Sequence, residues 1–259
     1  MKTIDTHAHI LKKSYPDNLQ EVIENTNKEN LIAINIAYDL ISSKEVIDIF
    51  KNNKNILPTI GIHPSDSKGW NNNYILELEK LINKNIIAIG EIGLDYHYEH
   101  YDKEEQKKAF KDQINLAIKH NLPIVVHTRD SLEDCYEIVK NYPNHKFLFH
   151  SWSGDPEITK KFLNLSKNFY FSFNGIFTFK NALIQKASIR EIPLDRIMFE
   201  TDCPWLTPVP FRGQINYPWR VKEVIKFTSK FLNMTYEELN LNNNKVAIEF
   251  YGIKKGILN

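Results

Sequence analysis

The 259-residue sequence has little cysteine and no long apolar run. Its two cysteines, Cys135 and Cys203, form no metal-binding or redox spacing, which excludes a disulfide framework and a cysteine metal cluster. No segment approaches the roughly 18 consecutive apolar residues of a membrane span. Residues 1–12 lack an apolar core followed by a small-residue cleavage pattern, so we expect no signal peptide. These absences favour a soluble cytoplasmic protein.

The sequence also has almost no net charge. Its 33 Lys and Arg residues balance 32 Asp and Glu residues, which leaves a formal charge of +1. Such a chain has no field that would gather nucleic acid non-specifically. A nucleic-acid substrate is still compatible with this balance, because bound metal ions can themselves neutralise a phosphate.

Linkers, internal repeats and low-complexity segments are absent too, so we expect one domain over residues 1–259. Short runs rich in Ile, Val and Phe alternate with stretches of helical periodicity, which is the pattern of parallel βαβ units. The expected strands are 3–8, 31–37, 56–62, 86–90, 123–127, 146–150, 168–173 and 196–200. The expected helices lie near 17–29, 43–53, 72–84, 103–121, 130–141, 156–166, 178–190 and 217–232.

Eight such units predict an α/β fold of the (β/α)8 TIM barrel type. An open doubly wound sheet is the alternative, but the first turn lacks a glycine-rich phosphate loop. We expect a C-terminal appendage of two short helices at 235–241 and 243–251, and turns at the polar tracts 71–73 and 242–244. The stretch 203–218 holds four prolines and is long enough to indicate a functional wall or lid.

The first predicted strand ends in Asp5-Thr6-His7-Ala8-His9. Residues two apart in a strand point to the same face, so His7 and His9 project their imidazoles side by side. Neutral imidazole is the commonest protein metal ligand, and two of them on a stiff element can share one ion. Histidines two apart also occur on solvated strand ends, so the pair alone leaves both interpretations open.

Further candidate ligands fall at the ends of other predicted strands, where barrels of this class form their active sites. They are His63 on the third strand, Glu91 on the fourth, His127 followed by Arg129 on the fifth, His150 on the sixth and Asp202 on the eighth. Singly, each has an ordinary explanation, such as a solvated histidine or an aspartate that caps a helix. Together, four imidazoles and two carboxylates predict two divalent cations about 3.5–4 Å apart, with one carboxylate bridging them.

Seven segments, in order along the chain, resemble the TatD family of metal-dependent deoxyribonucleases, within the wider amidohydrolase-like barrels. They are DTHAH (5–9), GIHP (61–64), GEIGLDY (90–96), VHTRD (126–130), HSWSG (150–154), FNGIFTF (173–179) and ETDCP (200–204). In order and spacing they are far more specific than any single His-x-His pair.

The resemblance implies a ligand set for two divalent metal ions, with Mg, Mn or Zn as the candidates. His7, His9 and Asp202 would hold the first metal, His127 and His150 the second, and Glu91 would bridge both. Arg129 and the Arg212-Gly213 loop match positions expected to face a phosphate, and His63 is expected behind the ligands or facing the substrate.

Two positions depart from the family pattern. Phe211 stands where members often carry His before the Arg-Gly pair, and Ser151-Trp152 stands where they often carry Cys-Phe. Neither position is a proposed ligand, so the departures concern substrate preference and leave the reaction type unchanged.

These features predict hydrolysis of phosphodiester bonds in DNA, single-stranded or at ends, with 3′–5′ exonuclease activity as one form. We expect a metal-activated water to attack, Asp202 to orient it and take its proton, and Arg129 to hold a phosphate. Trp205, Phe211 and Trp152 are candidates for stacking on a base, although core packing is favoured for Trp152. No membrane partner and no obligate protein partner is expected.

Two other functions remain open. The same site would serve amide or ester hydrolysis, including removal of an aminoacyl group from tRNA, and only the arginines favour a phosphate. A barrel that binds without turnover is disfavoured because all six ligand positions are filled.

Overall fold

The computed structural model describes residues 2–98 and 102–254, in which strands and helices alternate along the chain. The strands are β1 (Thr3–Ala8), β2 (Leu31–Asn35), β3 (Ile56–Pro58), β4 (Ile89–Asp95), β5 (Ile124–Arg129), β6 (Phe147–Phe149), β7 (Phe169–Phe173) and β8 (Ile197–Phe199). The α-helices are α1 (Leu19–Lys28), α2 (Leu40–Asn52), α3 (Asn72–Leu81), α4 (Lys103–Lys119), α5 (Leu132–Val139), α6 (Pro156–Leu165), α7 (Leu183–Ser188), α8 (Val221–Phe231) and α9 (Tyr236–Tyr251). Short 3₁₀ turns are η1 (Pro64–Asp66), η2 (Gly175–Thr178), η3 (Ile189–Glu191), η4 (Leu194–Arg196) and η5 (Pro218–Arg220).

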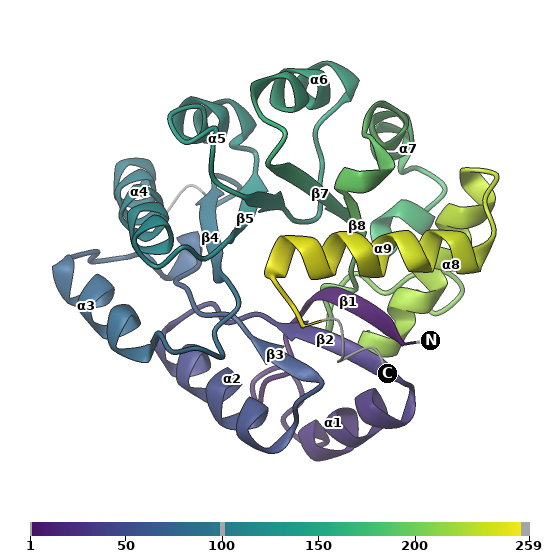
Figure 1. Cartoon of the computed structure of the whole chain (residues 1–259), viewed down its shortest axis with the longest axis horizontal. Helices are drawn as coiled ribbons and strands as arrows, with labels where there is room; N and C mark the ends of the chain where they lie inside the picture. Colours follow the sequence, from purple (N-terminus) through teal and green to yellow (C-terminus); the bar gives the residue numbers. More distant parts are fainter. Residues whose placement is uncertain (1, 99–101, 255–259) are drawn as a thin grey trace.

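The strands close into a ring with the helices outside it (Figure 1). Parallel pairing runs in the order β1-β2-β3 and β4-β5-β6-β7-β8. Isolated parallel bridges join these two sheets, between Ile60 and Ile89 on one side and between Ala8 and Cys203 on the other. The TIM barrel predicted from the alternation of elements is confirmed.

Alternation along each strand divides the core into an inner and an outer layer. In β6, Phe147 and Phe149 pack in the cluster that the surrounding helices share, whereas Leu148 packs in a second cluster with residues from the other strands. Successive strand residues point to opposite faces, so Leu148 lies inside the barrel. By the same parity His150 points inward just beyond the strand end.

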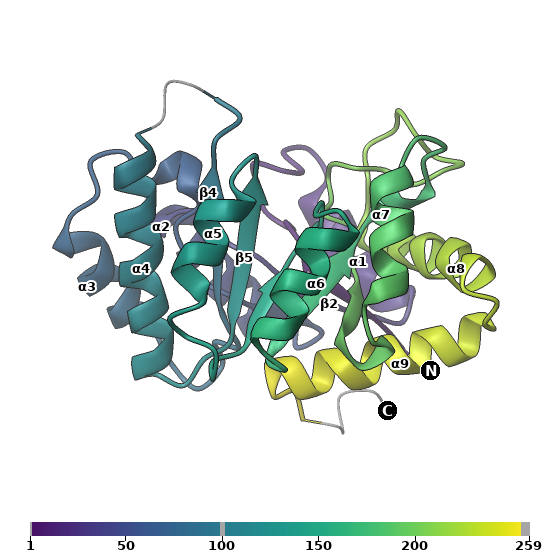
Figure 2. The ribbon, with the colours of Figure 1, turned by 90° about the horizontal axis from the view of Figure 1, so that it is seen from above.

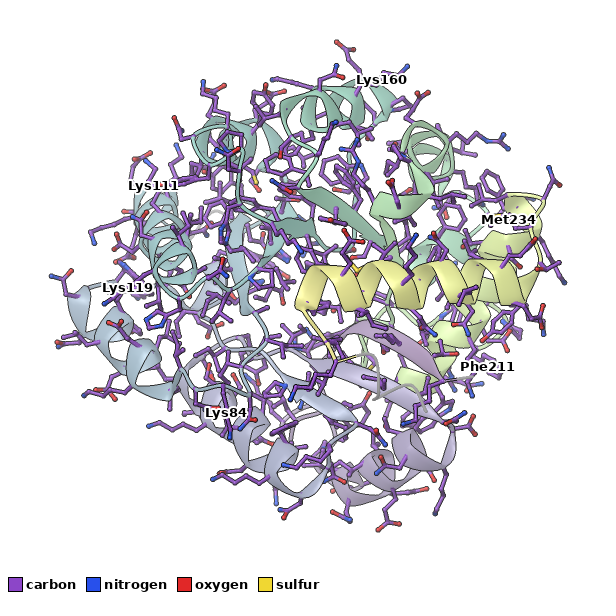
Figure 3. The ribbon with its side chains drawn as sticks, viewed as in Figure 1. Lys84, Lys111, Lys119, Lys160, Phe211 and Met234 are labelled. Carbon is purple, nitrogen blue, oxygen red and sulfur yellow. The ribbon has the colours of Figure 1, made fainter. Side chains whose placement is uncertain are left out.

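The outer helices present charge to solvent. Lys111 and Lys119 on α4 and Lys160 on α6 project away from the ring (Figure 3). Their helices turn apolar side chains toward the strands, as amphipathic surface helices do. No helix in the described part of the chain is long and apolar enough to cross a membrane. The cytoplasmic location stays a prediction.

One long helix, α9, lies across the end of the barrel where the strands begin (Figures 1 and 2). The two short helices predicted at 235–241 and 243–251, and the turn predicted at 242–244, are therefore wrong. Asn243 accepts a hydrogen bond from Phe199 N and donates one to the Ile4 carbonyl, and Asn244 accepts from Ile4 N. These asparagines satisfy main-chain groups of β1 and β8, so their polarity reflects a tertiary role.

Many other boundaries also differ from the predictions, and three of them have a local cause. β4 runs from Ile89 to Asp95 instead of ending at residue 90, so Glu91 lies within the strand and not at its end. The helix expected at 178–190 is reduced to α7, because η2 and a short connection precede it. Helix α2 begins at Leu40, since Asp39 caps it by accepting a hydrogen bond from Ser42 N.

Candidate metal centre

A cavity of about 850 Å³ opens where the barrel strands end, opposite α9. Its lining includes most of the residues singled out in the sequence, from six different strands or the turns that follow them. They are His9, His63, Glu91, His127, Arg129, His150, Asp202 and Trp205. His7 is fully buried beneath them. The strand order of the barrel therefore gathers side chains that are far apart in the sequence, such as His7 and Asp202, which are separated by 195 residues.

The first group of candidate ligands joins β1 to Glu91 and Asp202. His7 Nε2 lies 3.2 Å from His9 Nε2, 3.4 Å from Glu91 Oε2 and 3.7 Å from Asp202 Oδ1. His9 Nε2 lies 3.6 Å from Glu91 Oε2 and 3.4 Å from Asp202 Oδ1. Four ligands around an ion with bonds of about 2.1 Å are separated by about 3.4 Å in a tetrahedron. The spacing of the His7, His9 and Glu91 atoms fits one cation, and Asp202 lies near both histidines.

The second group shares the other oxygen of Glu91. Glu91 Oε1 lies 2.8 Å from His127 Nδ1 and 2.7 Å from His150 Nε2, and these two nitrogens are 3.2 Å apart. One carboxylate thus contacts both groups through different oxygens, as a bridging ligand would. The structure brings together all six residues predicted as metal ligands, and their ligand roles stay a prediction.

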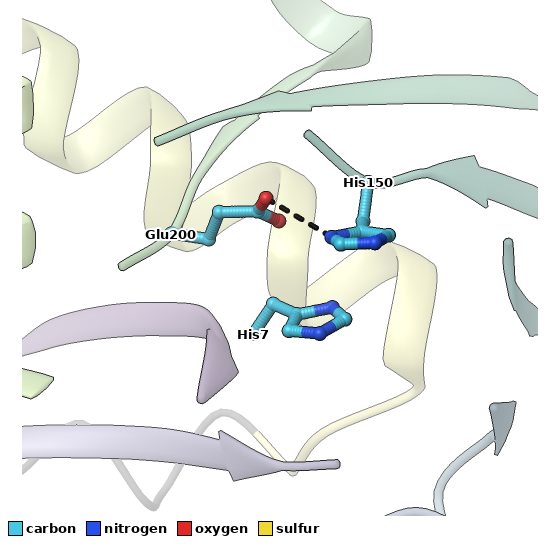
Figure 4. A group of neighbouring side chains, drawn as sticks. All are labelled: His7, His150 and Glu200. Atoms are coloured by element: carbon cyan, nitrogen blue, oxygen red, sulfur yellow. Dashed lines mark hydrogen bonds and ion pairs between the residues drawn. The ribbon is translucent and has the colours of Figure 1, made fainter. Parts of the chain in front are cut away.

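The outer ring nitrogens of three of these histidines have acceptors. His9 Nδ1 lies 2.9 Å from a main-chain carbonyl oxygen, and His127 Nε2 lies 3.1 Å from Asp95 Oδ2. His150 Nδ1 lies 3.4 Å from Glu200 Oε1, beside the His7 ring that stacks on it (Figure 4). Carbonyls and carboxylates only accept, so in the neutral rings each outer nitrogen carries the proton and each inner nitrogen keeps its lone pair.

The inner nitrogens consequently face other acceptors with no proton between them. His127 Nδ1 and His150 Nε2 both point at Glu91 Oε1, within hydrogen-bond distance of it. Lone pairs this close repel one another unless a positive charge lies among them. Imidazole nitrogens and carboxylate oxygens together form a donor set that suits Zn, Mn or related divalent ions. The residues therefore fit the metals that the sequence predicts.

Without a cation, protons bound to the histidines supply the positive charge that offsets this repulsion. Burial lowers the pKa of His150, but Glu91 and Glu200 outweigh burial and raise that pKa well above its usual value. Burial opposes the ionisation of Glu91, yet His150, His7 and His63 hold the pKa of its carboxyl well below its usual value. Protons and metal ions therefore compete for the same nitrogens.

Local backbone features set the ligands in place. Gly93 has a φ of 145°, and a Cβ at this position would lie 2.1 Å from the carbonyl oxygen of His127. Only glycine allows β4 to approach His127 this closely. On the opposite side of the barrel, buried Asp5 accepts hydrogen bonds from Thr201 N and Oγ1, which ties β1 to the segment that carries Asp202.

The residues predicted to contact substrate are not all at the cavity. Arg129 and Trp205 line it, with Trp205 half exposed and its ring 5.3 Å from that of His9. His63 also lines it, and burial, with the nearby His127, lowers the pKa of His63 to about 3. Arg212 is not brought to the cavity, because its guanidinium lies over the Phe179 ring, 4.3 Å from its centre.

The other two aromatic residues considered for stacking on a base, Trp152 and Phe211, do not line the cavity. Trp152 is buried among Phe149, Phe162 and Phe171, so the core packing favoured for it is confirmed. Phe211 lies 4.6 Å from the guanidinium of Arg220, away from the cavity lining.

Sequence reasoning missed two carboxylates behind the ligands. Asp95 and Glu200 both stand in segments that resemble the family but have no predicted role, and Glu200 is fully buried. Glu200 accepts hydrogen bonds from Ser151 N and Ser172 Oγ in addition to the His150 contact. Strand parity would have found it, because Met198 packs inside the barrel and Glu200 follows two residues later.

Comparisons with known proteins identify the family of this chain. The model of the family described as TatD related DNase matches residues 4–252. The chain belongs to the TatD family. The Bacillus subtilis protein named "Uncharacterized metal-dependent hydrolase YabD" is 38% identical over 239 residues, which are 91% of this chain and 93% of that protein. YcfH of Escherichia coli K12, which has the same description, is 32% identical over 92% of this TatD-family chain and 91% of its own.

A solved structure supports the fold. The crystal structure of YjjV, a TatD homologue from Escherichia coli K12, superposes with a TM-score of 0.88. It covers 97% of this chain and 98% of its own at 21% identity.

Proposed function

We propose that this TatD-family protein is a metal-dependent hydrolase that cleaves phosphodiester bonds at DNA ends. The observation that carries the proposal is the pair of ligand groups sharing Glu91 at the floor of a cavity lined by Lys13 and Arg129. A divalent pair, when bound, lowers the pKa of a coordinated water and offsets charge on phosphoryl oxygens. The cationic side chains favour a phosphate over a neutral acyl group.

Each residue has a place in this reaction. The Asp202 carboxylate reaches the cavity, and its Oδ1 is 3.4 Å from His9 Nε2, so it is positioned to orient a water and accept its proton. Arg129 presents a planar guanidinium that matches phosphate oxygens, and Lys13 adds a second positive charge. Trp205 offers an exposed ring on which the base next to the scissile phosphate would stack.

The shape of the site favours an end of a strand. A cavity of about 850 Å³ has the size of a pocket for a small ligand, and such pockets span about 300–1,000 Å³. A duplex needs an open groove for its uninterrupted backbone. We therefore infer that one or two terminal nucleotides enter the cavity while the remaining strand stays outside.

The direct test is a digest of DNA labelled at one end. Protein stripped with a chelator is reloaded with Mg²⁺, Mn²⁺ or Zn²⁺ and incubated with single-stranded and double-stranded DNA. We expect metal-dependent release of short products from an end of the strand. DNA left intact with every metal, together with cleavage of an aminoacyl or aryl ester, would assign the site to acyl hydrolysis and refute the proposal.

The bridging role of Glu91 has its own test. Glu91→Ala removes the carboxylate whose two oxygens lie within 3.4 Å of His7 and 2.7 Å of His150, so metal uptake and DNA hydrolysis should both be lost. Glu77→Ala is the control, because Glu77 lies on the surface of α3 and pairs with Lys80. Activity of the Glu91 variant equal to that of the control would remove Glu91 from the site.

A further inference from the structure

A third group of metal-type side chains lies beside the two described above. His63, Asp95 and His127 each offer an atom within 4.8 Å of the others' atoms. Two histidines and a carboxylate at such distances are a common arrangement for a metal site. Whether they bind a metal depends on which ring nitrogens carry protons.

The cap of η1 decides the tautomer of His63. The ring Nδ1 accepts a hydrogen bond from the main-chain N–H of Ser65 at 3.1 Å, and Ser65 Oγ lies 2.6 Å from the same nitrogen. A nitrogen that accepts from an N–H has no proton of its own, so the neutral ring carries its proton on Nε2. His63 Nε2 is therefore a donor and has no lone pair for a metal.

The neighbouring ring is arranged in the same sense. His127 Nε2 donates to Asp95 Oδ2 at 3.1 Å, while its Nδ1 faces Glu91. Two N–H groups and one carboxylate at the third group make a hydrogen-bonding arrangement instead of a metal site.

The His63 side chain lines the cavity, with Nε2 on the side of Glu91. The side chain is 15% exposed, and Nε2 is 3.8 Å from Glu91 Oε1, which is beyond hydrogen-bond distance. Among residues 2–98 and 102–254, no side chain or carbonyl accepts a hydrogen bond from this nitrogen. A donor is thus held in place beside the bridging carboxylate, with its partner to come from a ligand.

We propose that His63 binds no metal and donates its Nε2–H to a non-bridging oxygen of the substrate phosphoryl group. This rests on the proposed phosphodiesterase function. A donor fixed before the reaction stabilises the charge that grows on such an oxygen without any reorganisation of its own. The cap at Ser65 keeps the ring in the one orientation that presents the proton to the cavity.

Two substitutions separate the cap from the donor. His63→Asn places an amide near the position of Nδ1 and keeps a good N-cap, but it cannot reach the cavity. His63→Gln extends an amide N–H to about the position of Nε2. His120→Asn is the control, because His120 pairs with Glu79 on the outside of the barrel.

We expect the Asn variant to bind as many Mn²⁺ or Zn²⁺ ions as the wild type, with affinities within about threefold. Its kcat on DNA should fall about 10²–10³-fold, the range for loss of one such donor. The Gln variant should recover at least tenfold over Asn, and the His120 control should match the wild type. Loss of a metal ion, or tenfold weaker binding, in the Asn variant would make His63 a ligand and overturn the proposal; equal kcat in all variants would also overturn it.

An experiment independent of turnover uses the ring nitrogens directly. In ¹⁵N-histidine-labelled protein loaded with Zn²⁺, the His63 proton should sit on Nε2 before and after loading, and inorganic phosphate should shift that resonance. Replacement of the Nε2 proton by Zn²⁺, or no response to phosphate, would refute the role of His63. If the wild type cleaves no DNA while phosphate still shifts the resonance, the proposed function fails and the donor role stands.

Discussion

Substitution of Asp95 tests how the predicted metal ligand His127 is held in place, because the Asp95 carboxylate accepts hydrogen bonds from two donors. Its Oδ2 is 3.1 Å from His127 Nε2, and its Oδ1 accepts from His97 N at 2.9 Å. Asparagine has the same shape but only one acceptor oxygen, so Asp95→Asn turns an amide N–H toward one of the two donors. Either His127 rotates away from its ligand orientation or the turn at His97 loses its hydrogen bond.

The magnitude follows from the surroundings of the pair. A hydrogen bond to a charged group contributes about 1.5–3 kcal/mol. The Asp95 and His127 side chains are 6% and 17% exposed, so solvent screens the pair little. At about 1.4 kcal/mol per tenfold, this predicts metal binding weaker by about 10- to 150-fold. Loss of a partner behind a metal-binding histidine generally costs about 10- to 100-fold, which is the same range.

The assay is competition for Zn²⁺ between the protein and a chromogenic chelator, analysed as two binding steps. We expect the step that involves His127 to weaken while the far-UV spectrum stays that of the wild type. Asp48→Asn is the matched control, since Asp48 lies on the surface of α2 and pairs only with Lys51 among the described residues. Two binding steps within twofold of the wild type would show that Asp95 does not orient a ligand.

Four further results are expected. Gly93→Ala should lower the stability by at least about 2 kcal/mol, because the new Cβ meets a carbonyl oxygen at 2.1 Å; an unchanged Tm would contradict this. Trp152→Ala should cost about 3–5 kcal/mol in urea unfolding, since the side chain is 1% exposed, and a cost under about 1 kcal/mol would place it outside the core. Trp205→Ala should leave Tm unchanged, because the ring is 54% exposed, and should raise KM for DNA by about 5- to 150-fold through lost stacking; an unchanged KM would exclude stacking. Removal of metal with a chelator should lower Tm reversibly, since metal at a hundredfold excess over Kd stabilises by about 2.7 kcal/mol, and a Tm indifferent to metal would argue against the site.

Local patterns in the sequence were sufficient for the barrel and for most of the site. Alternating apolar runs and helical stretches predict parallel βαβ units whatever the detailed packing, because each strand must be covered on both faces. The strand period of two places His7 and His9 on one face, and their Nε2 atoms are indeed 3.2 Å apart. The rule that barrel sites form at strand ends supplied Glu91, His127, His150 and Asp202.

The ends of some strands and helices, and the residues that support them from other segments, were harder to predict from the sequence, for two physical reasons. Gly90 and Gly93 weaken the apolar run of β4, so the strand was expected to stop before Glu91, whereas its close packing on β5 requires glycine and extends it to Asp95. In α9, Asn243 and Asn244 have poor intrinsic helix preference, yet the main-chain groups that they satisfy on β1 and β8 outweigh it.

The sequence by itself determined the fold class, the end of the barrel that carries the chemistry and the types of side chain gathered there, because these depend on local periodicity and on connection order. Only the tertiary structure decided which nitrogen of each histidine faces the centre. For His127 and His150 that choice depends on acceptors from other segments, Asp95 and Glu200, and for His63 it depends on the Ser65 N–H, which donates to its ring. Spacing along the chain carries no record of such partners, because a ring presents either nitrogen from the same backbone position.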